Sequence, residues 1–161
     1  MTHGVAEAPI PWDVTTPMDA ARLLGGERVI GRTPVTAMET HDLLVAGLPG
    51  EALNHIVGHL TVLQPTASLE KAIGISLRTF QRRKDEPSKP LSQDQSGRTW
   101  KFAEILGWAG RVFGSQEEAE RWLDRPAISL NRRRPLDLLA TPKGVELVEQ
   151  CLGRIEHGVY T

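Results

Sequence analysis

The sequence has only one cysteine and no excess of either sign of charge, and each of these features excludes a class of protein. A single cysteine, Cys151, cannot form an intrachain disulfide, which excludes a disulfide scaffold and argues against a cysteine-rich zinc site. Neither sign of charge is in excess, because 19 Lys and Arg residues face 20 Asp and Glu residues, for a formal net charge of -1. That balance excludes a uniformly basic nucleic-acid coat, so any nucleic-acid binding must come from a local basic patch.

Long apolar segments are also lacking. No apolar run approaches the roughly 18 residues that a membrane-spanning helix needs, so no membrane partner is expected. The first residues, MTHGVAEAPIPWDVTT, have neither the basic start nor the apolar stretch of a secretory signal. We therefore expect a cytoplasmic protein. Its 161 residues, 40% of them hydrophobic, suffice for one medium domain or two small ones.

The distribution of prolines, glycines and apolar residues divides the chain into three parts. Residues 1–36 are rich in breakers and predict an N-terminal arm, partly ordered, with one helical candidate at Met18–Leu24. Residues 37–97 and 98–161 each show apolar residues at helical spacing and predict two helical domains. Strand-like alternation of convincing length is missing, so the predicted fold class is all-α.

Capping residues and breakers predict the helices of the middle part. Apolar spacing predicts a helix over Glu51–Leu63, and Ser68 is expected to cap a short helix after it. Ser76 is expected to cap a helix over Leu77–Asp85. The polar, proline-containing stretch 86–97 predicts a loop.

The same signals predict the helices of the last part. Thr99 is expected to cap a long helix that Gly114 ends, and Thr141 to cap the final helix. Ser115 and Glu118 match a capping box. The core residues predicted for this part are Trp122, Leu136, Leu139, Val148 and Cys151.

The two short helices on either side of Gly74 have the proportions of a helix-turn-helix. The second one carries four cations and no acid between Ser76 and Lys84. Short polar and cationic side chains together suit a recognition helix, which contacts base edges and phosphates. The residues predicted to contact DNA are Ser76, Arg78, Thr79, Gln81, Arg82, Arg83 and Lys84.

Two interpretations of this basic helix stay open. Lys89 and Arg98 add positive charge nearby and favour DNA, and so short a reading helix predicts a homodimer on paired half-sites. Asp85 and Glu86 follow the basic run directly and favour the alternative, a solvated helix face with no nucleic-acid partner.

Several motifs follow one another in the last third of the chain. They are VFG (Val112–Gly114), E-A-x-x-W-L (Glu118–Leu123), P-L-D-L-L (Pro135–Leu139), T-P-x-G (Thr141–Gly144) and the ending L-x-R-I-E-H-G-V-Y (Leu152–Tyr160). Through these motifs the region 109–161 resembles the toxin-binding domain of Xre/MbcA/ParS-type antitoxins, partners of RES-domain toxins. Residues 38–98 more loosely resemble the Xre-like helix-turn-helix part of the same family.

One stretch departs from the family pattern. Asn131-Arg132-Arg133-Arg134 stands where members usually have a glycine-containing loop. Asn131 can adopt the left-handed backbone conformation that a tight turn requires. The three arginines are expected to contact an acidic partner, DNA or only water.

The resemblance implies an antitoxin whose C-terminal segment covers the active site of an NAD-consuming RES toxin. It also implies binding to the operator DNA of its own operon, a homodimer and a larger toxin–antitoxin complex. The alternative is a helical interaction and dimerisation module that neutralises the toxin without direct DNA binding. The residues implied to bind the toxin are Arg154, Glu156, His157, Gly158, Val159, Tyr160 and Thr161.

The sequence offers little for catalysis. Metalloprotease, nucleophile-elbow, P-loop and dinucleotide fingerprints do not occur in it. His55 and His59 have a zinc-compatible spacing, but a site needs at least a third ligand and nothing nearby is well placed. We therefore expect no enzyme activity, no catalytic residue, no cofactor and no metal site.

Overall fold

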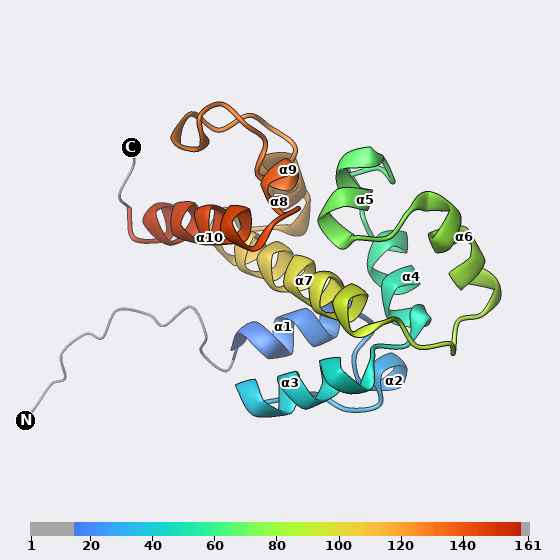
Figure 1. Ribbon diagram of the computed structural model, residues 1–161. Helices are drawn as coiled ribbons and strands as arrows, with labels where there is room; N and C mark the ends of the chain where they lie inside the picture. The colour runs from blue at the N-terminus through green and yellow to red at the C-terminus, as the bar shows by residue number, and fades with distance from the viewer. Residues whose placement is uncertain (1–14, 159–161) are drawn as a thin grey trace, which may run out of the picture.

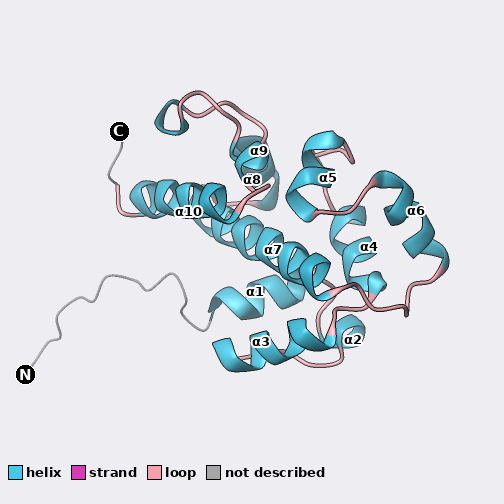
Figure 2. Ribbon diagram, viewed as in Figure 1, coloured by secondary structure: helices cyan, strands magenta, loops and turns pink. Residues whose placement is uncertain are grey.

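The computed structural model describes residues 15–158 of the chain. Within that range the protein is all-α, as expected, with no strand among the described residues (Figure 2). The helices are α1 (Thr15–Leu23), α2 (Glu27–Ile30), α3 (Ala37–Ala46), α4 (Gly50–Gly58), α5 (Ala67–Ile73), α6 (Leu77–Asp85), α7 (Gln93–Phe113), α8 (Gln116–Leu123), the 3-10 helix η1 (Ile128–Leu130), α9 (Pro135–Leu138) and α10 (Pro142–Glu156).

Helix α7 is the axis around which the other helices are arranged (Figure 1). In that view α4, α5 and α6 surround one end of α7, whereas α8, α9 and α10 lie around the other. Helix α7 is buried on several sides, and Trp100, Phe102, Ile105 and Leu106 are each at most 2% exposed. One hydrophobic cluster runs through the molecule, and the boundary expected between residues 97 and 98 falls inside α7.

The start of α7 corrects the prediction that Thr99 caps this helix and that the loop extends to residue 97. Ser92 is the cap, because its hydroxyl accepts a hydrogen bond from the Gln95 N–H at 3.1 Å. The Gln95 side chain accepts in return from the Ser92 N–H, also at 3.1 Å. This capping box starts the helix earlier, and Thr99 is buried inside it.

The part of the expected arm that the structure describes is helical. Ala20, Ala21 and Leu24 are at most 1% exposed, and α1 lies along α7 (Figure 1). Asp19 pairs with Arg111 of α7, which fixes the two helices side by side. Apolar packing therefore holds α1 against α7 in the main core. The earlier apolar residues of the arm lie outside the described residues.

Some predicted helix ends are confirmed and others are wrong. The Ser76 and Thr141 hydroxyls accept hydrogen bonds from the N–H groups three residues later, as expected for caps. Helix α4 ends at Gly58, five residues before the predicted end. Ser68 does not cap α5, whose cap position is Thr66, because the Ser68 hydroxyl accepts a hydrogen bond from a distant arginine.

The predicted core of the last part is confirmed. All five of its residues are at most 7% exposed, and the turn expected at Asn131 has a left-handed backbone with φ of 56°. The core residues are Trp122, Leu136, Leu139, Val148 and Cys151.

Candidate functional site

The turn between α5 and α6 has the geometry expected of a helix-turn-helix. Gly74 ends α5 in the left-handed conformation, with φ of 79°. A Cβ atom at this position would lie 2.6 Å from Arg98 Nη1, so a larger residue would also have to displace the Arg98 side chain. Arg98 donates hydrogen bonds to the Lys71 carbonyl and, at 3.2 Å, to the Ala140 carbonyl. Its guanidinium therefore fastens the turn to the C-terminal part, and the expectation that it adds DNA-facing charge is not supported.

One face of α6 carries unengaged polar head groups. Arg78, Gln81 and Arg82 are exposed and lie at i, i+3 and i+4, which places them side by side on the helix. No ion pair holds these side chains among the described residues. Lys84 is also exposed, with its Nζ 5.0 Å from the centre of the Phe80 ring. This face presents positive charge and a neutral amide to solvent.

The other predicted DNA contacts on α6 have internal roles. The Ser76 hydroxyl caps the helix and is 3.1 Å from the Thr79 hydroxyl. Arg83 is half-buried, and its Nη1 is enclosed without a hydrogen-bond partner. Its carbonyl accepts from Asn54 Nδ2 at 3.2 Å, and its Cδ lies beside Gly50. Arg83 thus lies toward α4 rather than on the exposed face.

The C-terminal end of α10 is fastened to α7. The Trp108 indole N–H donates to Glu156 Oε2 at 3.2 Å, so this carboxylate already has an internal partner. Arg154 is exposed, and the His157 N–H donates to the Gly153 carbonyl at 3.1 Å. Gly158 follows with a left-handed φ of 74°, which ends the helix. Of the remaining predicted toxin contacts, Val159, Tyr160 and Thr161 lie outside the described residues.

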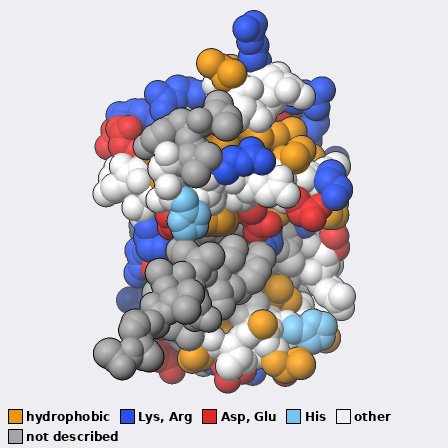
Figure 3. All heavy atoms as spheres, turned by 90° about the vertical axis from the view of Figure 1, so that its left-hand side faces the viewer, with side chains coloured by type: hydrophobic (Ala, Val, Ile, Leu, Met, Phe, Trp, Pro, Cys, Tyr) orange, Lys and Arg blue, Asp and Glu red, His pale blue; other side chains and the backbone are white. Residues whose placement is uncertain are grey.

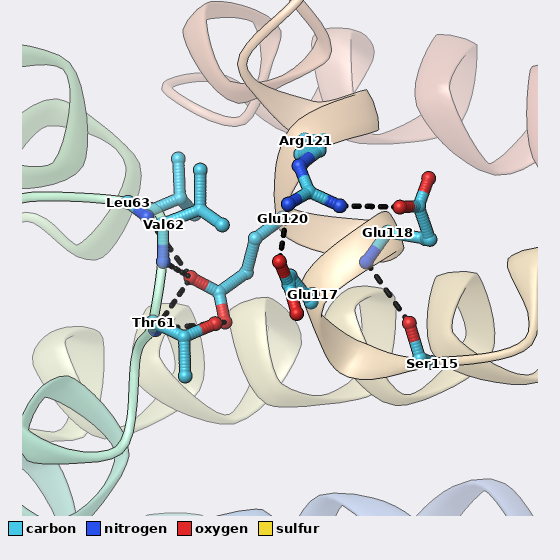
Figure 4. Close-up of polar contacts among 8 residues, drawn as sticks. All are labelled: Thr61, Val62, Leu63, Ser115, Glu117, Glu118, Glu120 and Arg121. Atoms are coloured by element: carbon cyan, nitrogen blue, oxygen red, sulfur yellow. Dashed lines mark hydrogen bonds and ion pairs between the residues drawn. The ribbon is translucent and has the colours of Figure 1, made fainter.

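Glu120 is a buried acid that joins the two ends of the molecule, and it does not stand out among the acidic residues of the sequence. Figure 4 shows its carboxylate, which comes from α8, pointing into the loop after α4. It accepts hydrogen bonds from the N–H groups of Thr61, Val62 and Leu63, with shortest distances of 3.0, 2.8 and 2.9 Å. Gln116 Nε2 donates a further bond at 2.8 Å.

The environment of Glu120 stabilises its charge. The residue is fully buried, and this burial by itself opposes ionisation. The hydrogen bonds from Gln116 and from the three backbone N–H groups outweigh that effect and lower the pKa of Glu120 below its ordinary value. Removal of a buried carboxylate that accepts several hydrogen bonds strongly lowers the free energy of unfolding. We infer that Glu120 holds the helix-turn-helix side and the C-terminal side in one arrangement.

The arginine triplet is divided between two roles. Arg134 is engaged, at 2.9 Å from both Asp124 and Asp137, and it donates to Ser68 of α5. Burial opposes the charge on Asp137, but hydrogen bonds from Arg134 and Ser68 lead to a lowered pKa. Arg132 and Arg133 are exposed. Arg134 is therefore a second link between the two ends, which the sequence did not distinguish from its neighbours.

The histidine pair has a structural role. His55 and His59 stack with ring centroids 4.1 Å apart, and His55 Nδ1 lies 3.1 Å from the Leu23 carbonyl. In the described part of the chain, no three His, Cys, Asp or Glu side chains are placed to hold a metal ion.

No helix between residues 15 and 158 is both long and apolar enough to span a membrane.

Two known protein families match this chain, one in the helix-turn-helix region and one in the C-terminal region. Residues 39–104 match the antitoxin Xre-like helix-turn-helix domain, which covers α3 to the first half of α7. Residues 109–158 match the antitoxin Xre/MbcA/ParS C-terminal toxin-binding domain, which covers α8 to α10. These two domains define an antitoxin of a toxin–antitoxin system, a regulatory protein and not an enzyme.

Curated relatives place the chain more narrowly. It is 30% identical over 121 residues to a protein named antitoxin Xre from Yersinia enterocolitica, covering 74% of this chain and 80% of that protein. A protein of the same name from Pseudomonas putida is 37% identical over 84 residues, 52% of each chain. A third, from Photorhabdus laumondii, is 28% identical over 133 residues, 82% of this chain and 88% of that one. The chain belongs to the Xre/MbcA/ParS-type antitoxin family.

Proposed function

We propose that this antitoxin neutralises a RES-domain toxin that degrades NAD by covering the toxin's active site with its C-terminal segment. We further propose that it represses its own operon by inserting α6 into operator DNA, as a homodimer that also forms larger complexes with toxin. The observation that carries this proposal is the placement of the two surfaces. Helix α6 and the end of α10 lie at opposite ends of the molecule (Figure 1), so one chain can hold both partners at once.

The toxin-facing end offers a firm base for the segment that follows α10. Trp108 holds Glu156, and Gly158 redirects the chain. A cleft that binds NAD must favour the anionic pyrophosphate, so it offers cations to which an acidic side chain can bind. We infer that Glu156 exchanges the Trp108 bond for such a cation and that Tyr160 fills the apolar part of the cleft. Arg154 and His157 then face polar groups at the rim.

The DNA-facing end would act through the exposed head groups of α6. Arg78, Arg82 and Lys84 suit phosphate contacts, and Gln81 lies between them, where it can reach a base edge. Ser76 would contribute through the helix N-terminus that it caps, together with the Thr79 hydroxyl bonded to it, and Arg83 would position the helix against α4. Contacts to a few phosphates make the affinity strongly dependent on salt.

A truncation tests the toxin half of the proposal. Removal of residues 157–161 keeps Glu156 and its bond to Trp108, so the core stays intact. We expect an unchanged melting temperature and unchanged DNA binding, but no protection of cells that express a RES-domain toxin which the unmodified chain neutralises. Full protection by the truncated protein, with the toxin's NAD consumption still blocked in vitro, would reject the covering model.

A second function has one observation in its favour. Three of the seven predicted DNA contacts, Ser76, Thr79 and Arg83, are engaged within the fold. This favours a helix-turn-helix that serves only for dimerisation, next to a toxin-binding end. Binding to DNA from upstream of the operon at several salt concentrations separates the two functions, since a dimerisation module gives no salt-dependent, operator-specific complex.

A further inference from the structure

The loop between α8 and α9, residues 124–134, is ordered by its own backbone hydrogen bonds. The Ala127 N–H donates to the Arg133 carbonyl at 3.0 Å, and the Arg132 N–H donates to the Ala127 carbonyl at 2.8 Å. The short helix η1 fills the turn, and Ser129 Oγ lies 3.2 Å from Cys151 Sγ of α10. These contacts fix the backbone of the loop against α10, so the side chains at its tip have defined positions.

The tip presents side chains that the fold itself does not use. Ile128 is 82% exposed, the largest exposed fraction among the large hydrophobic side chains described. Arg132 and Arg133 are exposed and make no ion pair within the described residues, in contrast to Arg134 with its two carboxylates. An exposed apolar side chain beside unpaired cations is an arrangement typical of a protein-binding surface.

The backbone at Arg132 strengthens this interpretation. Arg132 has φ of 62°, and only it and Asn131 among the described non-glycine residues have positive φ. Asparagine tolerates this conformation, whereas arginine does so at a cost that glycine would avoid. Backbone strain of this kind persists where the surrounding structure imposes it, and it concentrates at sites of function. The loop keeps a charged side chain at a position where glycine would be more stable.

The loop lies at the same end of the molecule as the end of α10. Figure 1 shows it above the C-terminal half of α10, on the side opposite to α6. Figure 3 views this end and shows hydrophobic side chains next to Lys and Arg side chains on its upper part. Arg154 lies three residues after Cys151, which touches the loop, and so extends the same surface toward the tail.

We propose that Ile128, Arg132 and Arg133 form a second toxin contact, separate from the tail. Ile128 enters an apolar hollow in the toxin wall beside its active site, and the two arginines pair with carboxylates around that hollow. This inference rests on the proposed function, because the occupant is the toxin that the tail covers. DNA is the less suitable occupant, because the loop lies away from α6 and an isoleucine gains nothing from phosphates.

Two variants test this contact. Ile128→Ser removes the apolar anchor from an exposed site, and Arg132→Gly with Arg133→Ser removes both charges while relieving the backbone at residue 132. We expect each variant to keep or raise the melting temperature and to weaken binding to the co-purified RES-domain toxin by about tenfold or more. The arginine variant should act mainly by slowing association and by reducing its salt dependence.

Matched controls change the same properties elsewhere. Met38→Ser removes an exposed apolar side chain from α3, and Arg32→Ser removes an exposed charge near α2. Both controls should bind the toxin as the unmodified chain does. Suppose that the unmodified chain binds the toxin and that neither loop variant changes the affinity by as much as twofold. That result would overturn the second contact and leave the proposed function intact. If the loop variants lose affinity for operator DNA and keep their affinity for the toxin, the second contact is overturned in favour of a DNA contact. If the unmodified chain binds no toxin, both the second contact and the proposed function are overturned.

Discussion

The exposed cations of α6 and two charged residues of the C-terminal end, Glu120 and Arg134, differ in what their head groups contact. On α6 the cations Arg78, Arg82 and Lys84 are exposed, and none has an ion-pair partner among the described residues. At the C-terminal end Glu120 and Arg134 are engaged in contacts within the fold. A run of charges in a sequence therefore indicates a binding surface only where the neighbouring elements leave its head groups free.

This contrast also predicts how each end responds to mutation. Substitutions on the exposed face of α6 should change affinity for a polyanion and leave stability almost unchanged. Substitutions of engaged charges at the other end should change stability first, and any loss of binding should follow from unfolding. Variants at both ends test this division.

The largest effect is expected for Glu120→Ala. The substitution leaves the N–H groups of half-buried Val62 and buried Leu63 without their acceptor, as well as that of the exposed Thr61. Each buried donor left unpaired costs about 1–3 kcal/mol, so we expect a loss of at least ~2 kcal/mol in the free energy of unfolding. Chemical denaturation measures this loss.

A nearby acid provides the control for that variant. Glu117 lies on the same helix, but it is exposed and pairs with Arg121 at the surface, so Glu117→Ala should change stability by less than about 0.5 kcal/mol. Equal stability of the two variants would show that Glu120 does not join the two ends.

A smaller effect, confined to DNA, is expected for Arg78→Ala combined with Arg82→Ala. Two lost phosphate contacts should reduce the slope of log affinity against log salt by about 2 and weaken operator binding by about 10- to 100-fold. Toxin binding and the melting temperature should stay as in the unmodified chain. Fluorescence anisotropy with operator DNA at several salt concentrations measures the slope.

Arg83→Ala refines the same experiment. Because Arg83 lies toward α4, its removal should lower the melting temperature and leave the salt slope unchanged. A slope reduced as much as in the double variant would place Arg83 on the DNA and contradict the division between exposed and engaged charges.

The smallest effect is a loss of stability that appears only in acid, and it follows from the pKa of Glu120. Its pKa is lowered in the folded protein, so the unfolded chain binds the proton more readily. The stability that its carboxylate contributes is complete above the ordinary value of about 4.5 and is lost as pH falls through the lower folded value. Thermal unfolding between pH 7 and pH 3 should show this decline, and Glu120→Gln should flatten it. An equally steep decline in the Gln variant would assign the acid sensitivity to other groups, such as Asp137.

Much of the fold follows from local signals that the sequence displays. Ser76 and Thr141 are correct caps because each hydroxyl accepts a hydrogen bond from an N–H that has no partner within the first turn of its helix. The start of α7 is harder to predict, because the capping box formed by Ser92 and Gln95 lies in a stretch full of polar residues and helix breakers. Ser96 lies in that stretch too, and its hydroxyl is tied to the Leu48 N–H by a tertiary contact at 2.9 Å.

The contacts that join the two ends were much harder to predict. A signal for Glu120 existed, because Leu123 lies three residues later on the same face of α8 and is fully buried. The partners of Glu120, however, are backbone groups nearly 60 residues earlier in the chain, which no helical pattern reveals. Arg134 likewise looks like its two neighbours in the sequence and differs only because Asp124 and Ser68 come near it in space.

The central helix has a consequence for how a repressor of this kind would communicate. With 21 residues at about 1.5 Å each, α7 is a rod of roughly 30 Å, with α6 near one end and α10 near the other (Figure 1). Arg98 ties α7 to α5, and Glu120 ties α8 to the loop after α4, so the helix-turn-helix side and the C-terminal side are held in one arrangement. In the proposed function, bound toxin would therefore lie at a set distance and angle from the operator. Steric exclusion between neighbouring toxins would then limit how many dimers one promoter binds.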